Sequence, residues 1–293
     1  MTAPLAGRCC LVTGATGTLG RALARRLRLD GAGLLLAGRS QARLDALADE
    51  MRRDIPGDAA LSTVAADLAE DDGVERVTAA ARAAGVGVLI NNAAIQGPIG
   101  PLADCDWAAW EETIRVDLLV PVALCRALTA SLAGATGGGR GKIVNISGGG
   151  ATGPRPRFTA YGTAKAALVR FTESFAAEAA LHRVDINAVA PGAMASAMTR
   201  EIAAAGGGRA GEREADAAET LLRDGGDAPD KAAALCSWLA SAASDRIGGR
   251  LLAALWDPWP TLDRHAAELA GSDIYTLRRI TPADRGKSWE EER

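Results

Sequence analysis

Residues 9–20 read CCLVTGATGTLG, and this stretch decides the fold. The apolar run from Cys9 to Val12 predicts a buried strand, and the segment from about Leu19 to Leu27 predicts a helix. Glycines in the turn between them let the backbone approach a pyrophosphate, and the helix N-terminus offers it free N–H groups. A Gly-rich turn alone is a weak signal, because any strand–helix connection can need glycine. At the start of an alternating chain it predicts a dinucleotide site with these contacts: Gly14, Thr16, Gly17, Thr18, Leu19 and Gly20.

The alternation of apolar runs and amphipathic segments continues down the chain. Further strands are predicted at Gly33–Ala37, Leu61–Ala65, Val86–Ile90, Lys142–Ile146, Val184–Val189 and Leu251–Leu255. Further helices are predicted at Gln41–Arg52, Val74–Ala84, Trp107–Leu132, Ala160–Leu181 and Lys231–Leu239. This pattern predicts an α/β fold of the Rossmann type, a doubly wound parallel sheet of about seven strands with helices on both faces.

The pattern also predicts the domain organisation. One Rossmann-type domain is expected over residues 1–260, with a substrate loop at about 195–230, and residues 261–293 form a C-terminal extension. The Gly-, Ala- and Glu-rich part from Ala203 to Asp230 is expected to be a mobile loop with helical pieces. In the extension, Asp273 to Arg279 is compact enough to dock near the substrate pocket or on a neighbouring subunit; the alternative is an ordered surface appendage.

Composition excludes several classes of function. The formal net charge of the 293 residues is -3, which gives no electrostatic footprint for nucleic acid. No apolar run is long enough to cross a bilayer, and the N-terminus before the first strand is too short for a signal peptide. We therefore expect a cytoplasmic protein without a membrane partner. The five cysteines form no Cys-x-x-Cys pair and there are two histidines, so no metal site is expected.

The end of the second predicted strand bears on the choice of cofactor. A domain that prefers NAD(H) would usually carry an acidic residue here to bind the ribose hydroxyls. This chain has Gly38-Arg39-Ser40 instead, and the guanidinium of Arg39 suits a 2′-phosphate. NADP(H) is therefore expected rather than NAD(H), with Arg39 and Ser40 as contacts. The alternative is a solvated surface arginine.

Five further motifs follow the glycine turn in order. They are ADL at 66–68, NNAA at 91–94, NIS at 145–147, YGTAK at 161–165 and PG at 191–192. With these motifs the chain resembles the short-chain dehydrogenase/reductase family over roughly residues 7–255, in the shorter-chain branch of the 3-oxoacyl-carrier-protein reductases. The resemblance implies an oxidoreductase that interconverts a carbonyl and a secondary alcohol by hydride transfer. One departure is the TGxxGxxG form of the glycine turn, which is more typical of the longer-chain branch with its epimerases and dehydratases.

Carried over by position, the resemblance implies further cofactor contacts. They are Asp67 and Leu68 beside the adenine ring, Asn91, Asn92 and Ala93 along the central part, Pro191 and Gly192 past the nicotinamide, and Ser196 where the family usually has a threonine.

Tyr161 and Lys165 are four residues apart on a predicted helix and therefore share a face. A free phenol has a pKa of about 10, and a nearby ammonium favours the phenolate and lowers that pKa. Tyr161 is therefore predicted to be the catalytic acid/base, which gives a proton to a carbonyl oxygen or removes one from an alcohol. The resemblance implies that Lys165 also holds the nicotinamide ribose, so that both side chains contact the cofactor.

Two more residues are predicted to take part in catalysis. Ser147 is expected to polarise the substrate carbonyl, although its spacing to Tyr161 is one residue longer than is common in the family and would align Gly148 with the family's serine. Flexible glycines after it can adjust the loop; the alternative is a serine that only hydrogen-bonds its own turn. Where the family often has an asparagine, this chain has Asp117, whose charge is predicted to pair with Lys165.

The substrate pocket is expected between the 96–105 loop, the 150–159 loop and the 196–230 segment. Its polar candidates are Gln96, Arg155 and Arg157. They suggest a polar or anionic small molecule, although surface solvation explains them nearly as well. The family pairs through its two long helices, so a homodimer or homotetramer is implied. Two alternatives stay open: a nicotinamide-dependent epimerase or dehydratase acting on a sugar-like substrate, and a catalytically decayed cofactor-sensing protein.

Overall fold

The computed structural model describes residues 3–226 and 228–289. Its strands form one parallel sheet in the order β3-β2-β1-β4-β5-β6-β7, which confirms the predicted Rossmann-type fold. They are β1 (Cys9–Val12), β2 (Gly33–Gly38), β3 (Leu61–Ala65), β4 (Val88–Asn91), β5 (Gly141–Ile146), β6 (Val184–Ala190) and β7 (Leu251–Ala253). The strand order reverses between β1 and β4, and sheets of this kind bind ligands in the crevice at that point.

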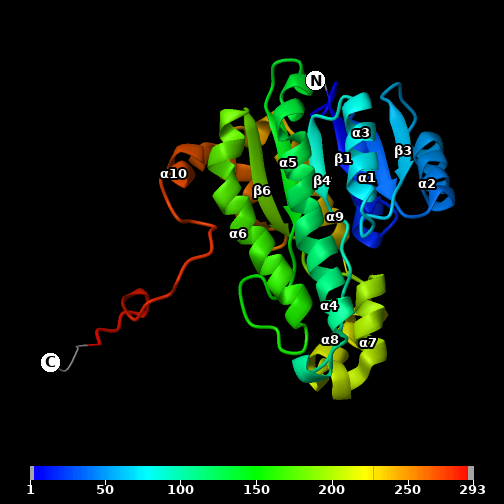
Figure 1. The fold of residues 1–293 in the computed structure, drawn as a ribbon. Helices are drawn as coiled ribbons and strands as arrows, with labels where there is room; N and C mark the ends of the chain where they lie inside the picture. Colours follow the sequence, from blue (N-terminus) through cyan, green and yellow to red (C-terminus); the bar gives the residue numbers. More distant parts are fainter. Residues whose placement is uncertain (1–2, 227, 290–293) are drawn as a thin grey trace.

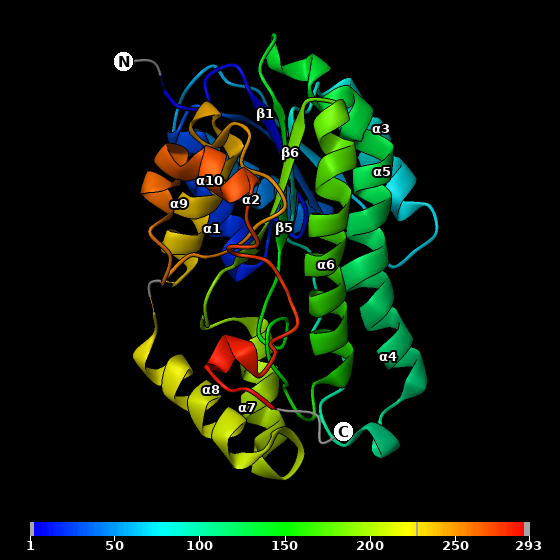
Figure 2. The ribbon, with the colours of Figure 1, turned by 90° about the vertical axis from the view of Figure 1, so that its left-hand side faces the viewer.

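Helices cover both faces of the sheet, as Figure 2 shows. They are α1 (Thr18–Leu29), α2 (Gln41–Asp54), α3 (Gly73–Ala83), α4 (Trp107–Ile114), α5 (Val120–Leu132), α6 (Thr159–Leu181), α7 (Ala197–Ala210), α8 (Glu212–Asp224), α9 (Ala228–Ala240) and α10 (Ala266–Ala270). One layer holds α1, α2 and α9, and the opposite layer holds α3, α4, α5 and α6 (Figures 1 and 2). No helix within the described ranges is long and apolar enough to span a bilayer.

Two apolar cores form because alternate residues of each strand point to opposite faces of the sheet. In β1, Cys10 and Val12 pack with α1 and α9, whereas Leu11 packs with α3 and α5. The register continues the alternation into β2, where Leu34 lies opposite Cys10 and Leu35 opposite Leu11. Strands buried on both faces read as continuous apolar runs, which is why the sequence revealed them.

The segment from Ala203 to Asp230, expected to be a mobile loop with helical pieces, contains more helix than expected, because it holds the end of α7, all of α8 and the start of α9. Its alanine, glutamate and arginine residues favour helix, and the two acidic residues in the first turn of α8 suit the positive end of the helix dipole. Two glycines with positive φ interrupt the helical conformation. Gly206 has φ 65° within α7, and Gly211, with φ 90°, separates α7 from α8. The two helices form a hairpin beyond the carboxyl edge of the sheet (Figure 1).

The C-terminal extension docks first on the edge of the chain's own sheet. The Leu251 N–H donates to the Tyr275 carbonyl at 2.9 Å. Buried Arg250 donates to three carbonyls of the extension, those of Ser272 at 2.9 Å, Ile274 at 2.7 Å and Leu269. Leu277 then packs on Ala151, Val169 and Ala188, behind the loop expected to line the pocket. From Arg278 the described chain runs away from the body (Figure 1).

Candidate functional site

The glycine turn lies against the carboxyl end of β4, where the strand order reverses. Gly14 has φ +62°, and a Cβ on it would lie 2.8 Å from the Ala93 Cα. A Cβ on Gly20 would lie 2.2 Å from the Gly14 carbonyl oxygen, so α1 can follow the turn this closely only with glycine there. A Cβ on Gly17 would meet only that same oxygen, at 3.4 Å. Because Gly17, the N-cap residue of α1, offers no side-chain cap, the first N–H groups of the helix remain available, which fits a pyrophosphate.

Thr13 and Asn92 fasten this turn to the end of β4. The Thr13 hydroxyl oxygen accepts hydrogen bonds from the N–H groups of Asn92 at 2.9 Å and Ala93 at 3.0 Å. The Asn92 amide donates to the carbonyls of Thr13 at 2.9 Å and Gly14 at 3.2 Å. Asn92 therefore holds the backbone that faces the crevice, and its side chain is committed to that task.

The structure places Asn91 inside the sheet rather than along the crevice. It is buried and lies opposite Asn145 in the register of β4 and β5. Its Nδ2 donates to Asn145 Oδ1 at 2.8 Å, and Asn145 Nδ2 donates to the Thr172 hydroxyl at 2.8 Å. These bonds tie β4, β5 and α6 together beneath the site. The sequence motifs contained both asparagines, but strand register is needed to see that they pair.

Arginines stand at the end of β2, where the adenosine side of the crevice is expected. Arg39 is exposed, and its guanidinium makes no hydrogen bond or ion pair within the described part of the chain. Ser40 caps α2 by accepting the Arg43 N–H at 3.4 Å, and Arg43 donates to the Thr16 carbonyl at 3.3 Å. Arg43 was missed from the sequence, although a second arginine in the first turn of the helix after Arg39 was a usable signal.

The remaining predicted cofactor contacts follow two strands, β3 and β6. Asp67 is exposed after β3 and accepts the Ala69 N–H at 3.0 Å, whereas Leu68 is buried in the core.

After β6, Gly192 has φ +88°, and a Cβ on it would lie 2.6 Å from Leu255. Ser196 caps α7 by accepting the Thr199 N–H at 3.3 Å. Its predicted place near the nicotinamide is compatible with this capping bond, because a hydroxyl oxygen can accept more than one hydrogen bond. Pro191, just before Gly192, is buried.

Tyr161, Lys165 and Asp117 form a cluster at the carboxyl edge of the sheet. Lys165 Nζ lies 5.5 Å from the centre of the Tyr161 ring and 3.3 Å from Asp117 Oδ2, which confirms the predicted pairing of this charge. It also donates to the Ile146 carbonyl at the end of β5, at 3.2 Å. Asp117 is fully buried and accepts the Ile95 N–H at 2.8 Å. One lysine therefore links α6, β5 and the long helix.

The helix that carries Asp117 is not regular. Residues 107–132 form one continuous helical rod as predicted, but Arg115–Leu119 adopts a π-helical turn between α4 and α5. Such turns widen the helix locally and often occur at functional sites. Here the turn contains Asp117, the residue that reaches both Lys165 and the backbone of Ile95.

Burial dominates the acid–base chemistry of the cluster. It raises the pKa of Tyr161; Lys165 opposes the rise, Asp117 adds to it, and Arg155 opposes it. Burial also raises the pKa of Asp117, against the opposing charge of Lys165. Lys165 thus lowers the pKa of Tyr161, as predicted, but the larger effect of burial raises it. Tyr161 is therefore a neutral phenol at neutral pH in the free protein.

Ser147 and Gly148 lie differently with respect to Tyr161. The Ser147 side chain is buried, and its hydroxyl has no hydrogen-bond partner among the described residues. A Cβ on Gly148, in contrast, would lie 2.3 Å from the Tyr161 hydroxyl. The residue in contact with the Tyr161 hydroxyl is thus the glycine that the shorter family spacing would align with the serine. The role of Ser147 stays a prediction.

The three predicted substrate residues have different environments. Gln96 is buried, and its Nε2 has no partner among the described residues. Arg157 donates to the carbonyls of Gly208 at 2.6 Å and Arg209 at 3.1 Å, so it fastens the end of α7. Arg155 pairs with Glu214 of α8 at 2.7 Å. The structure thus gives Arg157 a structural contact and leaves Gln96 and Arg155 as the candidates.

Comparison with known proteins gives a consistent result. Residues 8–206 match the family described as short chain dehydrogenase. Dehydrogenase/reductase SDR family member 4 of Pongo abelii is 30% identical over 248 residues, which cover 84% of this chain and 85% of that protein. Nodulation protein G of Rhizobium meliloti (strain 1021) is 36% identical over 203 residues, 68% of this chain and 78% of that protein. A solved structure from Beutenbergia cavernae, provisionally assigned as an NAD(P)-dependent gluconate 5-dehydrogenase and containing NADP, is 31% identical with a TM-score of 0.72, covering 87% of this chain and 97% of that one.

Proposed function

Because this chain belongs to the short-chain dehydrogenase family, an oxidoreductase family with a nicotinamide cofactor, we propose that it is an NADP(H)-dependent enzyme that interconverts a carbonyl and a secondary alcohol on a polar small molecule. The observation that carries the proposal is the buried Lys165, which joins Tyr161, Asp117 and the end of β5 in one cluster. The bound nicotinamide supplies or accepts the hydride.

Tyr161 provides the proton in the proposed reaction. Burial keeps its pKa above the ordinary value, so its hydroxyl is protonated at neutral pH and can donate to the oxygen of a carbonyl substrate. This protonation state suits the proton-donation step of carbonyl reduction. Lys165 holds the nicotinamide ribose, and its positive charge stabilises the phenolate left after proton donation. Ser147 is the proposed hydrogen-bond donor to the carbonyl oxygen.

The cofactor contacts proposed above follow the crevice from end to end. The α1 N-terminus after Gly17 takes the pyrophosphate, and Arg39 with Ser40 takes the 2′-phosphate. Arg43 adds a second cation there. The relative from Beutenbergia cavernae holds NADP, and its assigned substrate is a polyhydroxy acid, which supports NADP(H) and a polar substrate for this chain.

Arg39→Ala is expected to weaken the binding of NADPH about tenfold or more, and to leave the binding of NADH unchanged, because only NADPH carries the 2′-phosphate that a charged hydrogen bond would hold. Calorimetric titration of the purified protein with each nucleotide measures both dissociation constants. Arg53→Ala, an exposed arginine at the far end of α2, is the matched control and should change neither. Failure of the unmodified protein to bind either nucleotide would contradict the proposal.

Asp117→Asn is expected to move the pH dependence of carbonyl reduction to lower pH. Reduction needs protonated Tyr161, so the rate is present below the pKa of Tyr161 and is lost as pH rises through it. The negative charge of Asp117 raises that pKa, and its removal therefore lowers it. The measurement is kcat/KM against pH for both proteins with the same ketone. Superimposable profiles would show that this charge does not act on Tyr161.

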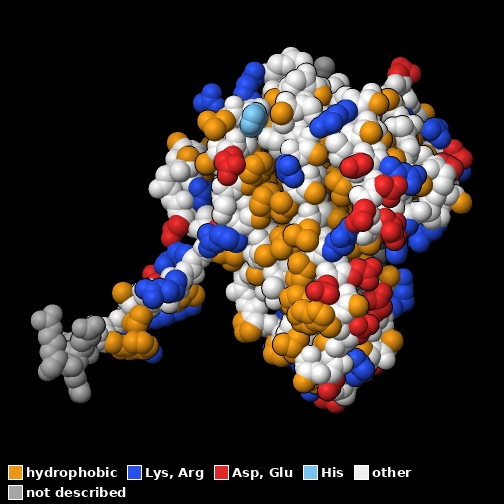
Figure 3. Space-filling model, viewed as in Figure 1, with side chains coloured by type: hydrophobic (Ala, Val, Ile, Leu, Met, Phe, Trp, Pro, Cys, Tyr) orange, Lys and Arg blue, Asp and Glu red, His pale blue; other side chains and the backbone are white. Residues whose placement is uncertain are grey.

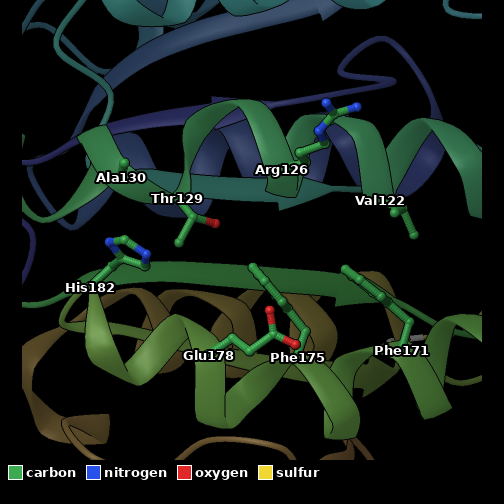
Figure 4. Close-up of a pocket in the computed structure, with 8 residues that line it drawn as sticks. All are labelled: Val122, Arg126, Thr129, Ala130, Phe171, Phe175, Glu178 and His182. Atoms are coloured by element: carbon green, nitrogen blue, oxygen red, sulfur yellow. The ribbon is translucent and has the colours of Figure 1, made fainter.

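We infer that the protein pairs through the face formed by α5 and α6. Hydrophobic side chains gather over α4, α5 and α6 in Figure 3, and Figure 4 shows the hollow between α5 and α6, with Phe171 and Phe175 on one side. Arg126 and Glu178 line the same hollow from opposite helices, so a two-fold copy could place each beside its opposite charge. Sedimentation equilibrium should give two or four times the chain mass of 30.0 kDa; a single-chain mass would exclude this.

A further inference from the structure

We propose that Arg155 binds a carboxylate of the substrate, and that Glu214 occupies this anion site in the free protein until the substrate displaces it. The inference rests on the proposed function, because it assigns a substrate class to the same site. It starts from the ion pair that joins the loop before α6 to the first turn of α8, with Arg155 Nη2 2.7 Å from Glu214 Oε2.

Arg155 lies next to the proposed proton donor. A Cβ on Gly148 would touch the Tyr161 hydroxyl, and a Cβ on the adjacent Gly149 would lie 3.8 Å from Arg155 Nε and Nη1. The hydroxyl and the guanidinium therefore flank two consecutive glycines. The charge of Arg155 also acts to lower the pKa of Tyr161, consistent with this proximity. A substrate whose carbonyl oxygen meets Tyr161 would thus bring a nearby carboxylate within reach of Arg155.

The Arg155–Glu214 pair leaves binding capacity unused. Both Nε, at 3.2 Å, and Nη2, at 2.7 Å, donate to the single oxygen Oε2 of Glu214. Arginine forms its strongest carboxylate pairs in a bidentate fork, with one nitrogen to each oxygen. The Glu214 side chain is 37% exposed, so leaving this pair for water costs it little. A substrate carboxylate that takes the bidentate arrangement would therefore displace it.

The guanidinium has a second contact besides Glu214. Its carbon lies 4.0 Å from the centre of the Phe158 ring, a cation–π contact, and the Arg155 side chain is only 17% exposed. Phe158 is itself fully buried at the start of α6. The cation is thus preorganised by an aromatic ring, which leaves the carboxylate partner as the exchangeable part.

The α7–α8 hairpin has attachments other than this ion pair. Arg157 fastens the carbonyls at the end of α7, and Arg209 donates to the Ile99 carbonyl at 3.0 Å. Apolar contacts add to this, in a cluster that contains Ile99, Phe158, Ile202, Ala210 and Ala218. Because the hairpin has its own attachments, a purely structural role for the Arg155–Glu214 pair would be redundant.

The test compares a keto acid with its uncharged ester, levulinate with methyl levulinate. We measure the ratio of their kcat/KM values with NADPH, and the ratio of their dissociation constants by calorimetric titration, which needs no turnover. Glu214→Gln should raise the preference for levulinate about threefold to fivefold, since a competing carboxylate is removed. Arg155→Gln should lower it about tenfold or more, since a charged hydrogen bond is lost. Glu212→Gln removes the same charge from the same turn of α8 and should leave the preference unchanged.

Equal effects of Glu214→Gln and Glu212→Gln would overturn the proposal, as would an unchanged preference in Arg155→Gln. The two readouts separate this inference from the proposed function. Reduction of both ketones with a preference that no variant alters would leave the oxidoreductase proposal standing and refute the anion site. Dissociation constants that follow the expected pattern without any reduction would support the anion site and count against the catalytic proposal.

Discussion

Tyr161→Phe is expected to lower kcat/KM for carbonyl reduction by about 10²- to 10⁴-fold, the usual contribution of a positioned general acid. The phenylalanine keeps the ring beside Lys165 and removes only the hydroxyl that would give the proton. Lys165 retains its bonds to Asp117 and the Ile146 carbonyl, so the architecture beneath the nicotinamide should persist. NADPH binding, measured by calorimetric titration, is therefore expected to stay within about threefold of the unmodified protein, less than the loss of one hydrogen bond.

The chain offers a matched control, because it contains one other tyrosine, Tyr275. Tyr275 lies in the C-terminal extension, and its carbonyl rather than its side chain accepts the Leu251 N–H. Tyr275→Phe should therefore leave kcat/KM unchanged. Equal kcat/KM of Tyr161→Phe and the unmodified protein would remove Tyr161 from the mechanism. NADPH binding without reduction by the unmodified protein would favour the alternative of a decayed, cofactor-sensing protein.

Much of the fold could be predicted from the sequence because a parallel sheet buried on both faces leaves a local signature. The run Cys9–Val12 becomes a central strand with the predicted bounds. The glycine turn could be interpreted for a similar reason, since Gly14 and Gly20 hold positions that a Cβ would block. In both cases the requirement, burial of a strand on both faces or close approach of two backbone segments, acts on residues that are neighbours in the sequence.

The errors concern properties that depend on residues far apart in sequence. The α7–α8 hairpin was expected to be a mobile loop with helical pieces, and the amount of helix was underestimated, because its glycines separate two helices that pack on Phe158 and Ile99. The position of Asn91 depends on its register with Asn145, 54 residues away. The pKa of Tyr161 depends on burial, which outweighs the neighbouring lysine and cannot be derived from a four-residue spacing.

A chain that ends at Pro260 is expected to lose about 5 kcal/mol or more of unfolding free energy. The truncation removes Leu262 and Leu269, which are 4% and 3% exposed in the core beside α9. Loss of a buried leucine side chain costs about 2–5 kcal/mol. It also removes the three extension carbonyls to which Arg250 donates, and losing hydrogen bonds to a charged group adds about 1.5–3 kcal/mol.

A chain that ends at Leu277 is the matched control, because it keeps the Arg250 contacts and both leucines. It also keeps the bond from the Leu277 N–H to Glu173, and it removes only the part that runs away from the body in Figure 1. Its unfolding free energy should fall within about 0.5 kcal/mol of the full chain, as for other exposed changes. Urea unfolding of the three proteins at one protein concentration measures the differences, since association would shift them by mass action. If the two truncated chains are equally stable, the contacts of Arg250, Leu262 and Leu269 contribute nothing to folding. That result would show that the extension is an appendage rather than part of the domain.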